Sequence, residues 1–179
     1  MIYTSIISTP LGAMTASAEG DALTGLWFIG QKYYPSETGA WVNEPNHTVF
    51  EILRTWLANY FSGSGCTPLP ALEPKGTSFQ KAVWEILLKI PCGRVTTYGE
   101  IAKKLAASRG LSSMSAQAVG GAVGHNPVSI LIPCHRVVGA DGSLTGYAGG
   151  LDKKKALLQL EQADMQNNHL KFKNIRMTR

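Results

Sequence analysis

Cys134, His135 and Arg136 are adjacent in the stretch ILIPCHRV, and a thiol beside an imidazole can form an activated nucleophile. The thiolate is the reactive form of cysteine, and positive charge from the two neighbouring side chains would favour it. Pro133 lacks a backbone donor and restricts Ile132 to extended conformations, so we expect Cys134 at an element boundary facing a pocket. The alternative is a small buried hydrophobic residue without chemistry.

Two polar residues elsewhere in the chain could complete this arrangement. Asn126 precedes Pro127 and could bridge the backbone of two segments. Glu161 interrupts an apolar helical pattern and could orient His135, which would give a nucleophile, a base and an orienting acid. Taken singly, an Asn-Pro pair is more often a turn, and a helical glutamate is more often solvated.

The elements that must position these residues fall into two groups, which predict an α/β (α+β) protein with two domains. Short apolar runs at 2–8, 13–18 and 22–28, separated by turn residues, predict an antiparallel sheet, and 48–61 predicts an amphipathic helix. Prolines at 66–76 indicate a linker, and the second half predicts mainly helices. We therefore expect an N-terminal support domain at 1–67, a linker at 68–76, a catalytic domain at 77–165 and a basic tail at 166–179.

Composition separates the two halves. The chain of 179 residues is 44% hydrophobic and 16% charged, as in ordinary globular proteins. Residues 1–74 hold two basic and six acidic side chains, a net charge of −4, whereas residues 75–179 hold fifteen basic and six acidic ones, a net charge of +9. Such a division is typical of a nucleic-acid-binding domain beside an accessory domain, although an inert basic face is the alternative.

Cysteine spacing and hydropathy restrict the class further. Three widely spaced cysteines argue against a disulfide framework, and the absence of a CxxC or HxxxH pair gives a structural zinc site little support. No apolar run is long enough to span a membrane, and the N-terminus lacks the pattern of a signal peptide. We expect a cytoplasmic protein with no membrane partner.

One predicted helix, AQAVGGAVG at 116–124, has poor intrinsic helix propensity because of Gly120 and Gly121. Glycines in a helix permit another backbone or a ligand to approach closely. Together with the preceding helix predicted at 98–107, this segment has the outline of a helix-turn-helix with a lengthened connection at 108–115.

The string NPVSILIPCHRVVG, followed by TGYAGG and LLQLE, resembles the active-site region of the O6-alkylguanine-DNA alkyltransferases, or methylated-DNA–protein-cysteine methyltransferases. FQKAVWEILLKIPCGRVTTYGEIA and AVGGAVG also match this family. The resemblance is strong over about residues 76–162 and loose before them. It implies a ribonuclease H-like N-terminal domain, a winged helix-turn-helix-like C-terminal domain, and a DNA-repair enzyme that reacts once and needs no metal or cofactor.

The resemblance also implies roles for individual residues. Cys134 would accept the alkyl group, His135 would act as a base through a water, Glu161 would hold His135, and Asn126 would be a hinge to the DNA-reading helix. Tyr98 would contact the flipped nucleotide, whose guanine pocket would be lined by Val137, Tyr147, Ala148 and Gly149. The partner would be double-stranded DNA containing O6-alkylguanine, with O4-alkylthymine as a second candidate substrate. A monomer would contact its minor groove through Ser78, Arg109, Gln117, Ala118, Gly120 and Gly121.

Gln117 departs from the family pattern, because many relatives have an arginine there that replaces the extruded base in the stack. Either Gln117 bonds to the unpaired cytosine, or the longer connection brings in Arg109 instead. Ala148 also replaces a serine that contacts O6 in some relatives. Two other functions stay open: a cysteine hydrolase that uses Cys134 and His135, and a protein that binds alkylated bases without removing the alkyl group.

Overall fold

The computed structural model describes residues 1–66 and 68–161, which form two compact units. The first unit contains Met1–Lys75 and also Pro127–Leu131, a short return that the sequence did not suggest. The second unit contains Gly76–Asn126 and continues from Ile132. Cys134, His135, Glu161 and Asn126 all belong to the second unit, so one unit can hold the candidate site.

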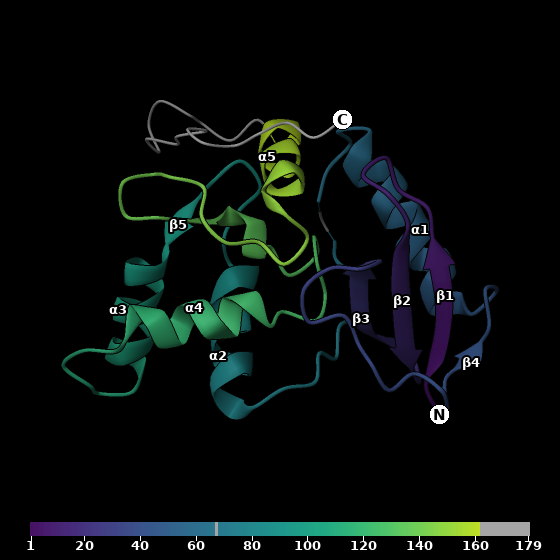
Figure 1. The fold of residues 1–179 in the computed structure, drawn as a ribbon, viewed down its shortest axis with the longest axis horizontal. Helices are drawn as coiled ribbons and strands as arrows, with labels where there is room; N and C mark the ends of the chain where they lie inside the picture. Colours follow the sequence, from purple (N-terminus) through teal and green to yellow (C-terminus); the bar gives the residue numbers. More distant parts are fainter. Residues whose placement is uncertain (67, 162–179) are drawn as a thin grey trace. The chain divides into compact units, whose positions relative to one another are not determined.

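The first unit is a four-stranded sheet with the strand order β3-β2-β1-β4 and one packed helix (Figure 1). β1 (Tyr3–Ile7), β2 (Met14–Glu19) and β3 (Ala22–Phe28) are antiparallel neighbours, as predicted. β4 (Val42–Asn43) pairs in parallel with β1, within a segment for which the sequence indicated only a loop. Two residues are too few to show an alternating pattern, so this strand had no sequence signal.

α1 (Thr48–Phe61) contacts β2 and β3, and its bounds are those that the periodicity predicts. The spacing of apolar residues in this segment predicts Ile52 on the buried face of the helix. In the structure Ile52 is 50% exposed, and Phe50 is fully buried instead. The helix begins after His47, whose ring nitrogen accepts a hydrogen bond from the backbone N–H of Val49. This side chain supplies a partner for one of the free amides at the helix start.

The second unit contains the remaining helices. They are α2 (Ser78–Leu88), α3 (Tyr98–Ser108), α4 (Ala116–Gly124), the short 3-10 helix η1 (Cys134–Arg136) and α5 (Leu151–Leu160). Thr77 and Gln80 form a capping box at the start of α2, an arrangement that typically contributes about 1 kcal/mol. α4 packs against both α2 and α3 (Figure 1). Trp84 of α2 donates to the carbonyl of Ala122 in α4 at 2.9 Å.

Two very short strands bring the site together. β5 (Thr96–Thr97) pairs in parallel with β6 (Val137–Val138), with Thr96 opposite Val137. β5 ends where α3 begins at Tyr98, and β6 begins directly after η1. The pairing therefore fixes Tyr98 near the Cys134 turn, although the two residues are far apart in the sequence.

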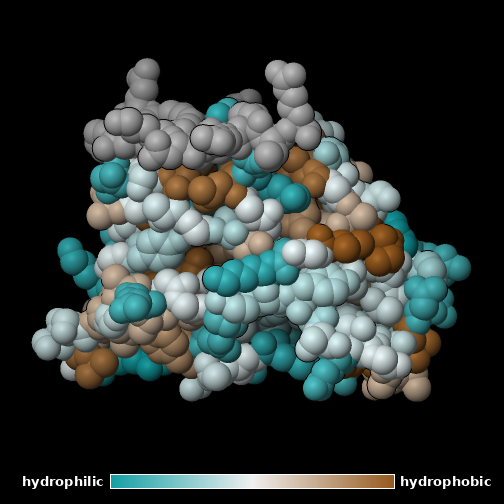
Figure 2. All heavy atoms as spheres, in the orientation of Figure 1, coloured by the Kyte–Doolittle hydropathy of each residue, from teal (hydrophilic) through white to brown (hydrophobic). Residues whose placement is uncertain are grey.

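No helix in the described ranges is long and apolar enough to cross a membrane. On the face shown in Figure 2, hydrophilic and intermediate residues separate the hydrophobic patches from one another.

Candidate active site around Cys134

The turn that carries Cys134 is buried throughout. Ile130, Leu131 and Ile132 are each at most 3% exposed, and Cys134 is 6% exposed. Residues 129–131 form a turn, and Ile130 has a φ of 74°, which is rare for a β-branched residue. Cys134 is the first residue of η1 and Pro133 is its N-cap, so Cys134 lies at an element boundary, as the sequence predicts.

Asn126 links the end of α4 to this turn. Its Nδ2 donates to the carbonyl of Ile132 at 2.7 Å, and the side chain is 4% exposed. The Asn126 side chain also hydrogen-bonds to the thiol of Cys134. The bridge between two segments that the sequence suggested for Asn126 is thus present, and one of its ends is the candidate nucleophile.

His135, Arg136 and Glu161 form a buried cluster behind the thiol. His135 Nε2 lies 2.6 Å from Glu161 Oε2, and the two side chains are 0% and 1% exposed. Arg136 Nε donates to Glu161 Oε1 at 2.7 Å, and its Nη2 donates to Oε2 at 3.0 Å. Glu161 is the C-cap residue of α5, so the end of that helix delivers the carboxylate.

The cluster defines the protonation of His135. Burial alone would raise the pKa of Glu161, but His135 and Arg136 together hold it well below the usual range, so the group is a carboxylate. A carboxylate only accepts hydrogen bonds, and His135 Nε2 must therefore carry a proton. Burial lowers the pKa of His135 in spite of Glu161, so the imidazole is neutral near pH 7.

His135 Nδ1 is consequently the nitrogen with a free lone pair. This atom is buried and has no hydrogen-bond partner among the described residues. A buried polar atom without a partner usually has a functional reason or a bound water. The ring is thus arranged to accept a proton at Nδ1 while Glu161 holds its other nitrogen.

The thiol is not activated by Arg136, which corrects the expectation from the sequence. Burial raises the pKa of Cys134 above its ordinary value, and this rise is opposed by the side chains of Asn126 and Lys154 and by backbone hydrogen bonds from Cys134 and His135. Arg136 instead binds Glu161 and the carbonyl of Ile90, to which its Nη1 donates at 2.7 Å. Cys134 therefore rests as a thiol and needs a base to react.

Lys154 is a site residue that the sequence analysis did not single out, because a run of three lysines is typical of a solvated helix face. Its side chain is 0% exposed, and its Nζ donates to the carbonyls of Val137, Thr145 and Gly146 at 2.5, 3.0 and 3.1 Å. Burial lowers its pKa to about 8. Only the tertiary structure shows that the middle lysine of the run points inward.

Tyr98 and Lys154 both bind the loop after β6. The hydroxyl of Tyr98 donates to the carbonyl of Thr145 at 3.1 Å, so Tyr98 and Lys154 hold the same acceptor. Burial raises the pKa of Tyr98, which keeps the hydroxyl protonated. Among the predicted guanine-pocket residues, Val137 is fully buried, whereas Tyr147, Ala148 and Gly149 are half-buried in the loop.

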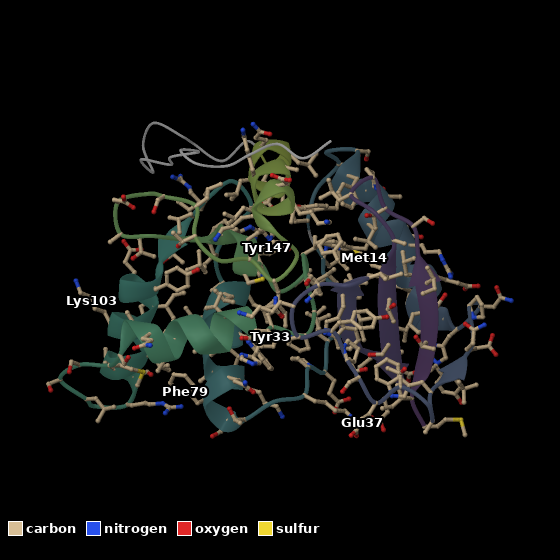
Figure 3. All side chains as sticks on the ribbon, viewed as in Figure 1. Met14, Tyr33, Glu37, Phe79, Lys103 and Tyr147 are labelled. Atoms are coloured by element: carbon tan, nitrogen blue, oxygen red, sulfur yellow. The ribbon has the colours of Figure 1, made fainter. Side chains whose placement is uncertain are left out.

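The predicted DNA-contacting residues lie on the surface and not in the cluster. Ser78, Gln117, Ala118 and Gly121 are exposed, and a Cβ on Gly121 would meet no atom within 4 Å. Gly120 is half-buried, and a Cβ there would lie 3.8 Å from the Tyr98 ring. Arg109 follows α3, and its guanidinium lies 5.6 Å from the ring centre of Phe79, which is labelled on α2 in Figure 3.

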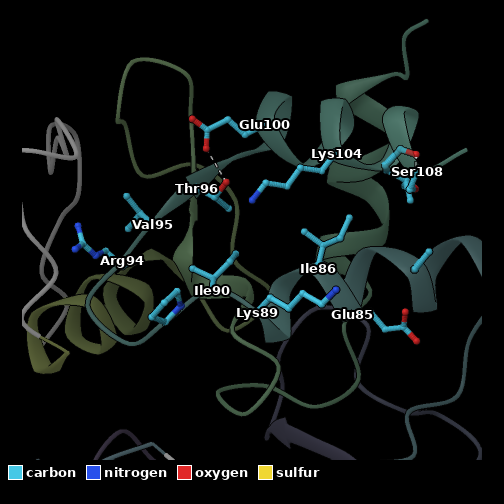
Figure 4. Close-up of a pocket in the computed structure, with 13 residues that line it drawn as sticks. Glu85, Ile86, Lys89, Ile90, Arg94, Val95, Thr96, Glu100, Lys104 and Ser108 are labelled. Carbon is cyan, nitrogen blue, oxygen red and sulfur yellow. Dashed lines mark hydrogen bonds between the residues drawn. The ribbon is translucent and has the colours of Figure 1, made fainter. Parts of the chain in front are cut away.

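A separate cavity of about 470 Å³ lies between α2, β5 and α3 (Figure 4). Apolar side chains such as Ile86 and Ile90 line it together with charged ones, and Thr96 donates to Glu100 within it. Cys134, His135 and Glu161 do not line this cavity. We therefore assign the chemistry to the buried cluster on the basis of its side chains.

Within the described residues no cluster of three or more metal-ligating side chains occurs.

Comparison with known proteins identifies both parts of the chain. Residues 78–163 match the family described as 6-O-methylguanine DNA methyltransferase, DNA binding domain, and residues 2–68 match its ribonuclease-like domain. The methylated-DNA–protein-cysteine methyltransferase of Mycobacterium tuberculosis is 43% identical over 163 residues, covering 91% of this chain and 94% of that protein. The corresponding protein of Methanosarcina mazei is 40% identical over 164 residues, covering 92% and 99%.

Solved structures agree with this similarity. The crystal structure of Mycobacterium tuberculosis OGT in complex with DNA superposes with a TM-score of 0.78 at 40% identity, covering 90% of this chain and 92% of that one. The O6-methylguanine DNA methyltransferase of Methanococcus jannaschii gives a TM-score of 0.61 at 29% identity, covering 96% and 99%. The two matched domains and the fold define a two-domain protein of the 6-O-methylguanine DNA methyltransferase class. The chain belongs to the methylated-DNA–protein-cysteine methyltransferase family.

Proposed function

We propose that this protein repairs DNA by transferring the alkyl group of O6-alkylguanine irreversibly to its own Cys134. The observation that carries the proposal is the buried Cys134 beside a neutral His135 whose Nδ1 has no partner among the described residues. The DNA complex of the Mycobacterium tuberculosis relative supports DNA as the substrate. O4-alkylthymine is a second candidate substrate of the same site.

The chemistry follows from the protonation states. A water passes the thiol proton to His135 Nδ1, and Glu161 stabilises the imidazolium that forms. The sulfur attacks the alkyl carbon, so that a C–S bond forms while the C–O6 bond breaks. Guanine leaves with a proton from the Tyr98 hydroxyl, and His135 returns a proton to Tyr98. The thioether product has no hydrolytic exit, and each molecule therefore reacts once.

Access to O6 requires the base to leave the duplex, because a stacked base cannot reach a buried thiol. We assign α4 to the minor groove, where Ala118, Gly120 and Gly121 permit close approach. Either Gln117 or Arg109 fills the gap left by the base, and a monomer suffices for the reaction. Tyr98 contacts the flipped nucleotide, and the loop with Tyr147, Ala148 and Gly149 holds the guanine beside Val137.

The experiment is mass spectrometry of the protein after incubation with duplex DNA that contains O6-methylguanine. We expect a gain of one methyl group, located on Cys134 by peptide mapping, and no second equivalent. Cys134→Ala should abolish the gain. Cys92→Ala is the matched control, because Cys92 is an exposed cysteine outside the cluster, and this variant should react like the unmodified protein.

The two alternative functions predict different results. An unchanged protein mass with retained DNA affinity would identify a protein that binds alkylated bases without transfer. Repeated turnover of an ester or peptide, abolished by Cys134→Ala, would identify a cysteine hydrolase. Either result would contradict alkyl transfer.

A further inference from the structure

Arg136 uses three guanidinium nitrogens inside the buried cluster. Two donate to the oxygens of Glu161, and Nη1 donates to the carbonyl of Ile90 at the end of α2. The residue is 6% exposed, and a buried guanidinium is tolerated only when it is paired and hydrogen-bonded. The planar fork matches a carboxylate bidentately, which a lysine cannot do. Arg136 therefore fixes both the position and the plane of the Glu161 carboxylate.

The charges in the cluster balance in only one protonation state of His135. Glu161 contributes one negative charge, and Arg136 already neutralises it through a bidentate pair. With a neutral imidazole the three side chains carry no net charge. An imidazolium would add a positive charge in a site that is closed to solvent, close to the ammonium of Lys154.

We propose that Arg136 is a positioning residue for the transfer: it holds Glu161 in place and keeps His135 neutral, with Nδ1 open, until the thiol proton arrives. The proposal rests on the proposed function of His135 as the base. Glu161 Oε2 accepts hydrogen bonds from both His135 and Arg136. The negative charge of the carboxylate is therefore partly neutralised by Arg136, and it stabilises a proton on the imidazole less strongly. Without the guanidinium, Glu161 would favour an imidazolium before any substrate binds.

Among residues 1–66 and 68–161, the charged and titratable groups that face His135 are Glu161 and Lys154 from α5 and its end, and Cys134 and Arg136 from η1. Glu161 raises the pKa of His135, whereas Arg136 and Lys154 lower it and burial lowers it most. Removal of the Arg136 charge should therefore raise this pKa. A protonated His135 cannot accept the thiol proton, and the acidic limb of the rate profile should move to higher pH.

The first test needs neither substrate nor a variant. The ring nitrogens of isotope-labelled histidine are followed by NMR in the unmodified full chain, free of DNA. We expect His135 to be neutral near pH 7 and to carry its proton on Nε2. An imidazolium at that pH, or a proton on Nδ1, would overturn the proposal.

The second test compares Arg136→Met with Arg136→Lys, which keeps the charge and loses the fork. In Arg136→Met the titration of His135 should move to higher pH, because a positive charge that opposes its protonation is removed. The single-turnover rate on O6-methylguanine DNA should fall more than about tenfold near pH 6, and this deficit should narrow as the pH rises. Arg136→Lys should restore the acidic limb and retain a rate deficit that does not vary with pH.

A deficit of the same size at every pH in Arg136→Met, with His135 titrating as in the unmodified protein, would assign Arg136 a purely structural role and overturn the proposal. Failure of the proposed function has another signature. The unmodified protein would then not accept the alkyl group from O6-methylguanine DNA. The NMR titrations would still report whether Arg136 controls the protonation of His135.

Discussion

The surroundings of Cys134 and the outer face of α4 are both built by the second unit, but they differ in how completely the protein occupies them. In the first region Cys134, His135 and Glu161 are buried, and fixed partners hold the polar side chains. In the second region Gln117, Ala118 and Gly121 are exposed. The side chains around Cys134 are therefore held in place by the protein itself, whereas the outer face of α4 is open to solvent.

Among the substitutions that test this difference, we expect the largest effect from Glu161→Gln, which keeps the shape of the side chain and removes its charge. Arg136 would lose its counter-charge inside the cluster, and the loss of one partner of a buried pair typically costs about 3–5 kcal/mol. We expect the free energy of unfolding in urea to fall by that amount and the single-turnover rate to fall about 100-fold or more. Glu37→Gln, at an exposed glutamate of the first unit, is the control and should change both quantities little. A transfer rate near that of the unmodified protein would argue against the assignment of Glu161.

Lys154 offers a test by pH. Its pKa is about 8 in the folded protein against 10.5 in an unfolded chain, so between these values the unfolded state binds more protons. Stability contributed by this group must therefore rise with pH across that window, by at most about 3 kcal/mol. We expect urea unfolding of the Cys134→Ser protein to gain stability from pH 8 upward relative to the same protein with Lys154→Met. Parallel curves would mean that the ammonium titrates normally.

Gly121→Ala examines the open region. The added methyl meets no atom of the protein within 4 Å, and alanine is favoured over glycine in an exposed helix interior by about 1 kcal/mol. We expect thermal stability to increase and affinity for duplex DNA to decrease, because the methyl occupies space needed for close approach. If the variant is more stable and binds DNA equally well, the proposed contact of α4 with the minor groove is wrong.

The smallest effects on stability are expected for Gln117→Ala and Arg109→Ala. Both residues are exposed, so the free energy of unfolding should change by less than about 0.5–1 kcal/mol, the larger value for the contact of Arg109 with Phe79. DNA affinity and transfer rate should fall several-fold for whichever residue fills the gap left by the base. If neither variant differs from the unmodified protein, both hypotheses are wrong.

The sequence predicted the elements that carry strong local signals. α1 and α4 have the predicted bounds, because periodicity and capping residues define them without tertiary context. β4 and β6 were missed, since strands of two residues show no alternation. The family resemblance indicated Cys134, His135 and Glu161 as partners, which residue types alone could suggest but not distinguish from ordinary structural roles.

The electrostatics of the site could not be predicted, because they depend on burial and direction. Adjacent cations suggested an activated thiolate, but Arg136 binds Glu161 and burial raises the pKa of Cys134. Lys154 is one of three consecutive lysines, and only the packing of α5 distinguishes it from its neighbours. Both corrections concern which way a long side chain points, and local sequence does not encode this.

The unequal exposure of two cysteines has a consequence for the storage and ageing of the protein. Cys92 is exposed on the turn after α2, whereas Cys134 is shielded and rests as a thiol. Oxidation by peroxide requires access and thiolate character, and Cys134 is poor in both. An oxidant dissolved in the surrounding water will therefore modify Cys92 before Cys134.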